Sequence, residues 1–210
     1  MRPKIKLPLP PILLNRCCGS SHGWLAFQQR RFRGIFLFHP FFGETINLPS
    51  LELYIDRITL SKNPSTSPRD FEVAAICKNL DVGDSLAILK PGNKAWFLRV
   101  FRGPRPCDVI YYNERYSVVF CEGIILSTDA LPPSKSTALE FYLVKTTTNE
   151  LLRVERSHPL KPDSSVKICK LVTSPTTQTF MFVDVDDLGD EVLFVSPRFH
   201  VCLGFQISGM

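Results

Sequence analysis

Three short segments of this 210-residue chain contain residue types that could bind a ligand. The first contains Cys17, Cys18 and His22, whose sulfur and nitrogen atoms are ligands that zinc prefers. A structural zinc site needs four such ligands, usually as two spaced pairs, and the sequence offers no second pair. We therefore expect no metal here and interpret both cysteines as reduced thiols.

The second segment, residues 184–190, is rich in aspartate and has the composition of a calcium-binding loop. An EF-hand loop requires an oxygen ligand at its fifth position and a glutamate at its twelfth. Counted from Asp184, these positions hold Leu188 and Val195, whose side chains have no oxygen. The segment is therefore predicted to be an acidic turn between strands.

The third segment, residues 28–33, places Arg30, Arg31 and Arg33 around Phe32. Cationic side chains beside an aromatic ring are typical of surfaces that bind phosphate and stack on a base. Residues 1–50 carry seven Lys or Arg and one acid, although the whole chain has a formal charge of only +5. Two interpretations stay open: a partner surface, which could include nucleic acid, and a solvated hairpin tip. The modest net charge favours the tip over nucleic acid.

Three common catalytic motifs are missing from the sequence: the phosphate-binding loop, H-E-x-x-H and Cys-X-X-Cys. The four histidines also lack a recurring acidic neighbour. We therefore expect no enzyme activity and no cofactor. A triad assembled from distant positions, as in a hydrolase with a cleft on the fold, is kept as an alternative.

Composition predicts that strands position these segments. The chain has 16 Phe and 17 Pro, and proline is the poorest helix former whereas aromatic residues favour strands.

No apolar run reaches the roughly 18 residues of a membrane span, so we expect no membrane contact. Prolines interrupt the apolar N-terminal segment, which argues against a secretory signal. With an odd number of cysteines, seven, the chain is expected in the cytoplasm or nucleus.

Short apolar runs recur along the chain in units that begin near residues 23, 71, 107, 141 and 191. A four-stranded propeller blade occupies about 40–45 residues, and the units recur at roughly this interval. A sandwich or a barrel would also show regularly spaced strands, so the period leaves these folds open. Residues 1–14 are predicted to be a Pro-rich lead-in and 15–210 one domain. Residues 61–69, with two prolines, are predicted to form an exposed loop.

Several segments, in order, resemble a known plant family. They are residues 18–25, 37–40, 45–49, 108–113, 141–144, 150–154, 187–190 and 193–195. This pattern is similar to the F-box-associated domain of unknown function 295, also called the KIB-type β-propeller, over roughly residues 15–200. The matching positions are structural ones: a turn before a buried ring, strand ends and an acidic turn. They include Gly23, Trp24, Pro40, Pro49, Gly189 and Asp190.

The resemblance implies an all-β fold, an incomplete β-propeller with about four blades of antiparallel strands plus a partial blade. It also implies a protein-interaction domain that recognises substrates for a ubiquitin ligase, with a protein partner that the sequence does not identify. An F-box would need more than the residues that precede the first blade, so we expect this chain to lack one. A nucleic-acid-binding β domain and a non-functional truncated gene product are the alternatives. Open propeller edges would favour self-association.

Overall fold

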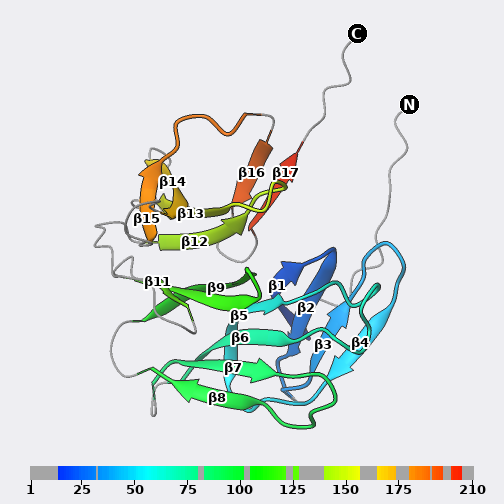
Figure 1. The fold of residues 1–210 in the computed structure, drawn as a ribbon. Coiled ribbons are helices and arrows are strands. Elements are labelled where there is room, and N and C mark those ends of the chain that lie inside the picture. The colour runs from blue at the N-terminus through cyan, green and yellow to red at the C-terminus, as the bar shows by residue number, and fades with distance from the viewer. Residues whose placement is uncertain are drawn as a thin grey trace. The chain divides into compact units, whose positions relative to one another are not determined.

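The computed structural model describes residues 14–31, 33–79, 83–101, 105–121, 125–127, 140–156, 165–173, 180–189, 191–195 and 200–204 (Figure 1). Every regular element in these ranges is a β-strand. Within them there is accordingly no apolar helix with the length to cross a membrane. The chain divides into two compact units, unit 1 (Met1–Val100) and unit 2 (Phe101–Met210).

Unit 1 begins with a four-stranded antiparallel sheet whose strands lie side by side in chain order. Its strands are β1 (Asn15–Ser21), β2 (Trp24–Gln29), β3 (Ile35–Phe38) and β4 (Thr45–Leu48). The β1–β2 turn contains Gly23 at φ 81°, a conformation that glycine adopts without strain. β3 ends two residues before Pro40, and β4 ends directly before Pro49. Proline has no N–H to extend a strand ladder.

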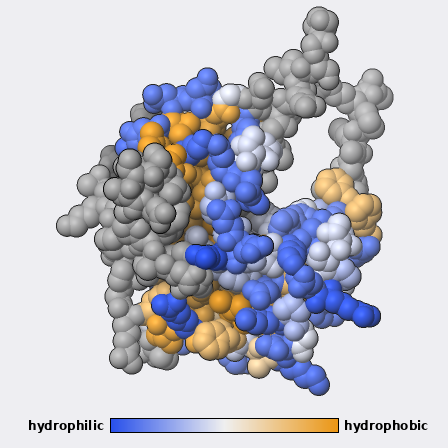
Figure 2. Space-filling model, viewed as in Figure 1, coloured by the Kyte–Doolittle hydropathy of each residue, from blue (hydrophilic) through white to orange (hydrophobic). Residues whose placement is uncertain are grey.

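The second sheet of unit 1 has the same order and direction of strands. It consists of β5 (Tyr54–Leu60), β6 (Val73–Lys78), β7 (Ser85–Leu89) and β8 (Phe97–Val100). β8 lies at the sheet edge, and all four of its side chains are exposed. Apolar atoms are visible over this part of the surface in Figure 2. Self-association through an open edge stays a prediction.

The two sheets of unit 1 enclose one apolar core. Because side chains alternate between the faces of a strand, every second residue points into it. The buried members are Cys18, Trp24, Ala26, Ile35, Leu37, Leu51, Ile55, Ile58, Leu60, Val73, Ala75, Cys77, Ala87 and Leu89. β1 and β5 approach each other closely: a Cβ on Gly19 would lie 2.4 Å from the carbonyl oxygen of Ile58. Only glycine permits this contact without a backbone shift.

Polar side chains also join the two sheets of unit 1. The Gln28 side chain donates to the Leu53 carbonyl at 2.8 Å and accepts from the Ile55 N–H at 3.1 Å. Arg16 donates to the Ile55 carbonyl and lies 3.4 Å from the Asp56 carboxylate. These bonds satisfy polar groups that the sheets would otherwise bury unpaired.

Unit 2 contains three further antiparallel sheets in its described residues. The first has β9 (Pro106–Tyr112), β10 (Arg115–Phe120) and β11 (Ile125–Ser127). The second has β12 (Glu140–Lys145), β13 (Leu151–Arg156), β14 (Val166–Thr173) and β15 (Phe180–Asp184). β16 (Glu191–Val195) pairs with β17 (His200–Gly204).

Both faces of the β12–β15 sheet are apolar. One carries Phe141, Leu143 and Leu151, which pack with Val119 of β10. The other carries Tyr142, Val144, Leu152 and Val154. A buried carboxylate links two sheets: Asp108 of β9 is 1% exposed and accepts from the Leu143 N–H at 2.7 Å.

The prediction of an all-β chain is confirmed, and the predicted units near residues 107, 141 and 191 coincide with the starts of three sheets. The starts near residues 23 and 71 were wrong, because β1 and β5 precede them. β1 reads Asn-Arg-Cys-Cys-Gly-Ser-Ser and has no apolar run. In β5 the apolar run is broken by Asp56 and Arg57, where the register shifts at a bulge.

Candidate functional site

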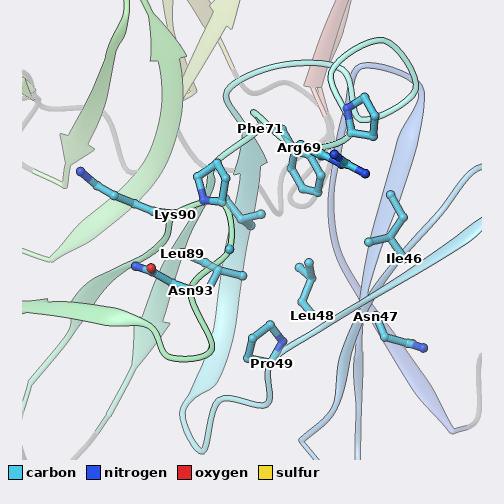
Figure 3. Close-up of a pocket in the computed structure, with 13 residues that line it drawn as sticks. Ile46, Asn47, Leu48, Pro49, Arg69, Phe71, Leu89, Lys90 and Asn93 are labelled. Carbon is cyan, nitrogen blue, oxygen red and sulfur yellow. The ribbon is translucent and has the colours of Figure 1, made fainter.

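Unit 1 contains a groove of about 480 Å³ that opens to solvent (Figure 3). β4 with Pro49, the β5–β6 loop with the start of β6, and the end of β7 with the following turn form its walls. Its lining residues are Ile46, Asn47, Leu48, Pro49, Pro68, Arg69, Phe71, Val73, Leu89, Lys90, Pro91, Gly92 and Asn93. Both sheets of the unit therefore contribute to one concave surface.

The first wall is the outer strand of the first sheet. In β4 the half-buried Ile46 and Leu48 alternate with the exposed Thr45 and Asn47. Ile46 and Leu48 pack against the apolar core and also line the groove. The alternation thus gives the wall an apolar side and leaves the amide of Asn47 at the solvent boundary.

The second wall is the β5–β6 loop, which is held by Asn63. The Asn63 side chain accepts from the Ser65 N–H at 3.0 Å and lies 3.3 Å from the indole Nε1 of Trp24. An ion pair between Lys62 and Asp70 joins the two ends of the loop. These contacts hold the segment that carries the arginine and the phenylalanine of the groove.

The third wall is the turn between β7 and β8. The Asn93 N–H donates to the Lys90 carbonyl at 3.1 Å, and Gly92 between them has φ 77°. The indole of Trp96 donates to the Pro49 carbonyl at 2.9 Å, so the turn is tied directly to the end of β4. This bond joins two of the three walls.

The groove is positively charged. Arg69 and Lys90 are exposed, and no acidic residue is among its lining residues. Phe71, Ile46 and Leu48 supply apolar surface, and Asn47 supplies an uncharged polar group. These side chains can bind a molecule through contact and charge. They do not include a nucleophile with a neighbouring base, which hydrolysis by a covalent mechanism would need.

A second cluster of polar groups lies on β13–β15 of unit 2. Arg153 and Glu155 form a buried ion pair, and the Arg153 guanidinium lies 3.9 Å from the centroid of the Phe182 ring. Burial, and then the negative charge of Glu155, raise the pKa of the Cys169 thiol. A nucleophilic cysteine needs a lowered pKa, so this environment keeps Cys169 a neutral thiol.

The same cluster extends to an exposed ion pair. The hydrogen bond from Lys167 to Asp184, at 2.9 Å, lowers the pKa of the Asp184 carboxyl. The same bond raises the pKa of Lys167. Both groups are on the surface, where an ion pair contributes little to stability.

The predicted arginine tip lies at the β2–β3 turn. Arg30 and Arg31 are exposed, whereas Arg33 is half-buried and has φ 54°. None of the three lines the groove. Phe32 lies outside the described residues. The prediction that this tip is a partner surface stays a prediction.

The two segments whose residue types suggested a metal site, residues 17–22 and 184–190, lie in strands and turns where the structure describes them. Cys18 is buried and its thiol contacts the Arg16 carbonyl at 3.4 Å. Asp187 accepts from the Gly189 N–H at 2.8 Å, which makes a local turn, while Asp190 lies outside the described residues. Across the described residues, no three His, Cys, Asp or Glu side chains gather as a metal site would require.

One motif was not identified from the sequence. Residues 19–23 read Gly-Ser-Ser-His-Gly, which fits the G-x-S-x-G spacing of a nucleophile elbow. That motif works on a strand-to-helix turn, and here the serine lies at a β-hairpin instead. The hydroxyl of Ser21 contacts the Leu60 carbonyl at 3.5 Å. The backbone at this match is therefore that of a hairpin and not that of a nucleophile elbow.

Sequence reasoning did not identify the groove residues Arg69, Phe71 and Lys90. Each follows or precedes a proline-containing turn, and the flanking Pro68 and Pro91 are a signal that both loops are rigid. The loops are about twenty residues apart along the chain, and only the pairing of β6 with β7 brings them together.

Residues 2–207 match the family described as KIB1-4 beta-propeller. The Arabidopsis thaliana F-box protein At4g00893 is 27% identical over 132 residues, which is 58% of this chain and 32% of that protein. The F-box protein At4g12382, also from Arabidopsis thaliana, is 36% identical over 53 residues, which is 25% of this chain and 38% of that protein. The chain thus spans about a third of the length of these relatives.

A solved structure, the PQQ-bound form of aldose sugar dehydrogenase from Streptomyces coelicolor, aligns with a TM-score of 0.47 at 16% identity. The alignment covers 68% of this chain and 57% of that chain. Similarity at this level carries no argument about the chemistry of the present chain. The family match extends over nearly the whole sequence, and the described sheets follow one another as antiparallel blades. The chain therefore belongs to the KIB1-4 beta-propeller family, as an all-β propeller whose described sheets are about four blades and part of another.

Proposed function

We propose that this chain is a non-enzymatic protein-interaction domain that recognises a substrate protein for a ubiquitin ligase. Its family and the F-box proteins among its relatives support this role. The observation that carries the proposal is the open, cationic groove of unit 1, which is formed by strand β4 and by two hydrogen-bonded loops of the second sheet. Loops displayed on a rigid β scaffold are a common way to bind another protein.

The chemistry of the described residues supports binding over catalysis. The buried Cys77 has a pKa raised to about 12 by desolvation, so its thiolate is scarce at neutral pH. Cys169 is shifted in the same direction. Neither thiol has the lowered pKa of a catalytic cysteine.

The proposal is tested by cross-linking the tagged full chain to its neighbours in plant cells, followed by mass spectrometry. The expected result is a specific protein that co-purifies with the chain and whose half-life shortens when the chain is overexpressed. A proteasome inhibitor should restore that half-life. A partner whose half-life never changes would contradict the ligase role and leave protein binding intact.

The non-enzymatic part has its own test. Purified chain is incubated with panels of ester, peptide, glycoside and phosphate-ester substrates, with heat-denatured chain as the control. We expect no turnover above the control. Turnover that is lost in the Ser21→Ala variant would overturn the proposal and would instead support a hydrolase.

A further inference from the structure

The two cations of the groove differ in pairing from two other lysines of unit 1. Lys62 forms an ion pair with Asp70, and Lys78 forms one with Asp84 at 2.9 Å. For Arg69 and Lys90, the described residues provide no acidic partner. Because both groove cations are exposed and lack such a partner, the groove keeps a local positive charge that a ligand can meet.

The floor between these cations is apolar and incompletely covered. Ile46, Leu48 and Phe71 pack on the core with one side, and each keeps part of its surface exposed to the groove. Removing this exposed surface from water is favourable. The floor therefore fits a partner that presents an apolar side chain.

The rim favours recognition of an extended chain through side chains. Pro49, Pro68 and Pro91 have no N–H, so at these positions the rim cannot pair with a partner strand as a sheet edge does. Asn47 and Asn93 are exposed on the lining, and an asparagine amide can both donate to and accept from a peptide group. In Figure 3 the labelled side chains come from all three walls around one opening.

We propose that this groove binds an extended segment of a partner protein in which acidic residues flank an apolar side chain. The inference rests on the proposed function and names the chemistry of the segment that the domain recognises. The apolar residue occupies the floor formed by Ile46, Leu48 and Phe71. The flanking carboxylates pair with Arg69 and Lys90.

A nucleic acid is the less suitable ligand for this surface. Single-stranded nucleic acid binds to tracks of cations with exposed rings on which bases stack. The groove has two cations, and its phenylalanine is partly buried against the core. We therefore make nucleic acid an outcome of the test.

The first experiment selects a phage-displayed library of random peptides on the immobilised full chain. In parallel, the library is selected on the Arg69→Glu/Lys90→Glu variant and on an Arg105→Glu/Lys145→Glu control, which carries the same change of charge at exposed positions outside the groove. We expect the wild type and the control to enrich peptides with acids around an apolar residue, and the groove variant not to enrich them.

Selected peptides are then synthesised and measured by fluorescence anisotropy. Replacing their acids by glutamine, or their apolar residue by serine, should weaken binding at least about tenfold, as loss of a charge-assisted or apolar contact does. A labelled single-stranded RNA should bind no better to the wild type than to the groove variant. Thermal unfolding of each variant shows that it is folded before its binding is compared.

Several results of the selection would overturn the inference: enriched peptides that lack acidic residues, the same peptides enriched on the groove variant, loss of these peptides on the control as well, or no enriched peptide at all. RNA binding that depends on Arg69 and Lys90 would also overturn it. The cellular cross-linking experiment separates the two proposals. A partner that the groove variant still captures refutes the groove inference and leaves the proposed function standing. Selective peptides without any cellular protein partner refute the proposed function and leave the groove inference standing.

Discussion

The indole ring of Trp24 meets the imidazole ring of His39 edge to face, with centroids 5.1 Å apart and ring planes at 89°. The indole is 2% exposed, and its Nε1 lies 3.3 Å from Asn63 Oδ1 and 3.3 Å from Ser65 Oγ. One side chain therefore fills the core of unit 1 and also anchors the β5–β6 loop. A mutation of Trp24 should therefore also alter the groove wall that this loop forms.

Replacing Trp24 by alanine should lower the free energy of unfolding by about 3–5 kcal/mol, because a large buried side chain is lost and a cavity remains. The matched Trp24→Phe variant keeps most of the apolar volume and loses the N–H donor, so its loss should be smaller. Denaturant unfolding of both variants measures the difference. Unchanged stability in the alanine variant would mean that the ring faces solvent.

Gly19→Ala should destabilise unit 1 by about 1–3 kcal/mol, since the new methyl group has to displace backbone. Its position would be 2.4 Å from the carbonyl oxygen of Ile58. Gly34→Ala is the control, because there the nearest atom is the flexible end of the Gln29 side chain, at 2.5 Å. Thermal melts of the two variants should differ clearly. Equal melting temperatures would refute the close contact between β1 and β5.

Asp108→Asn should cost about 1–3 kcal/mol, because a buried acceptor of two backbone N–H groups becomes a mixed donor and acceptor. The carboxylate accepts from Leu143 at 2.7 Å and from Val109 at 2.9 Å. Asp187→Asn changes an exposed aspartate that also accepts a backbone N–H, and it should be nearly neutral. Hydrogen exchange at the Leu143 amide, faster in the Asp108 variant alone, reports the lost bond.

The pKa of Cys77, raised to about 12 by burial, predicts a loss of stability at alkaline pH. Above about pH 9 the unfolded chain releases the thiol proton while the folded chain retains it, so unfolding becomes more favourable as pH rises. The free energy of unfolding should therefore be lower when it is measured above this pH than when it is measured below it. The decline should be shallower in Cys77→Ala. Identical slopes in the two proteins would contradict the raised pKa.

Sequence reasoning succeeded where a strand shows an apolar run or a polar–apolar alternation between turns. Ile35–Phe38 is a continuous apolar run and Thr45–Leu48 alternates polar with apolar residues, and both are strands. It failed at β1 because that strand faces β5 with Gly19 and polar residues, which have no period-two apolar signal. Close packing of backbones selects against the side chains that make a strand recognisable.

The groove was beyond sequence reasoning for a different reason. Arg69 and Lys90 lie in separate loops, and neither has a local motif. Their shared surface depends on the pairing of β6 with β7 and on the bond from Trp96 to Pro49. The arginine tip was conspicuous because its cations are adjacent in sequence, whereas cations that meet only through tertiary structure leave no comparable pattern.

The groove is lined by residues of both sheets of unit 1, and this has a thermodynamic consequence. A molecule seated there touches both sheets simultaneously and can do so only while they remain docked. Binding of this molecule would therefore stabilise the docked arrangement of the two sheets. The melting temperature of unit 1 would rise with the concentration of the molecule, by mass action. Ligand binding and folding of unit 1 would then be thermodynamically linked.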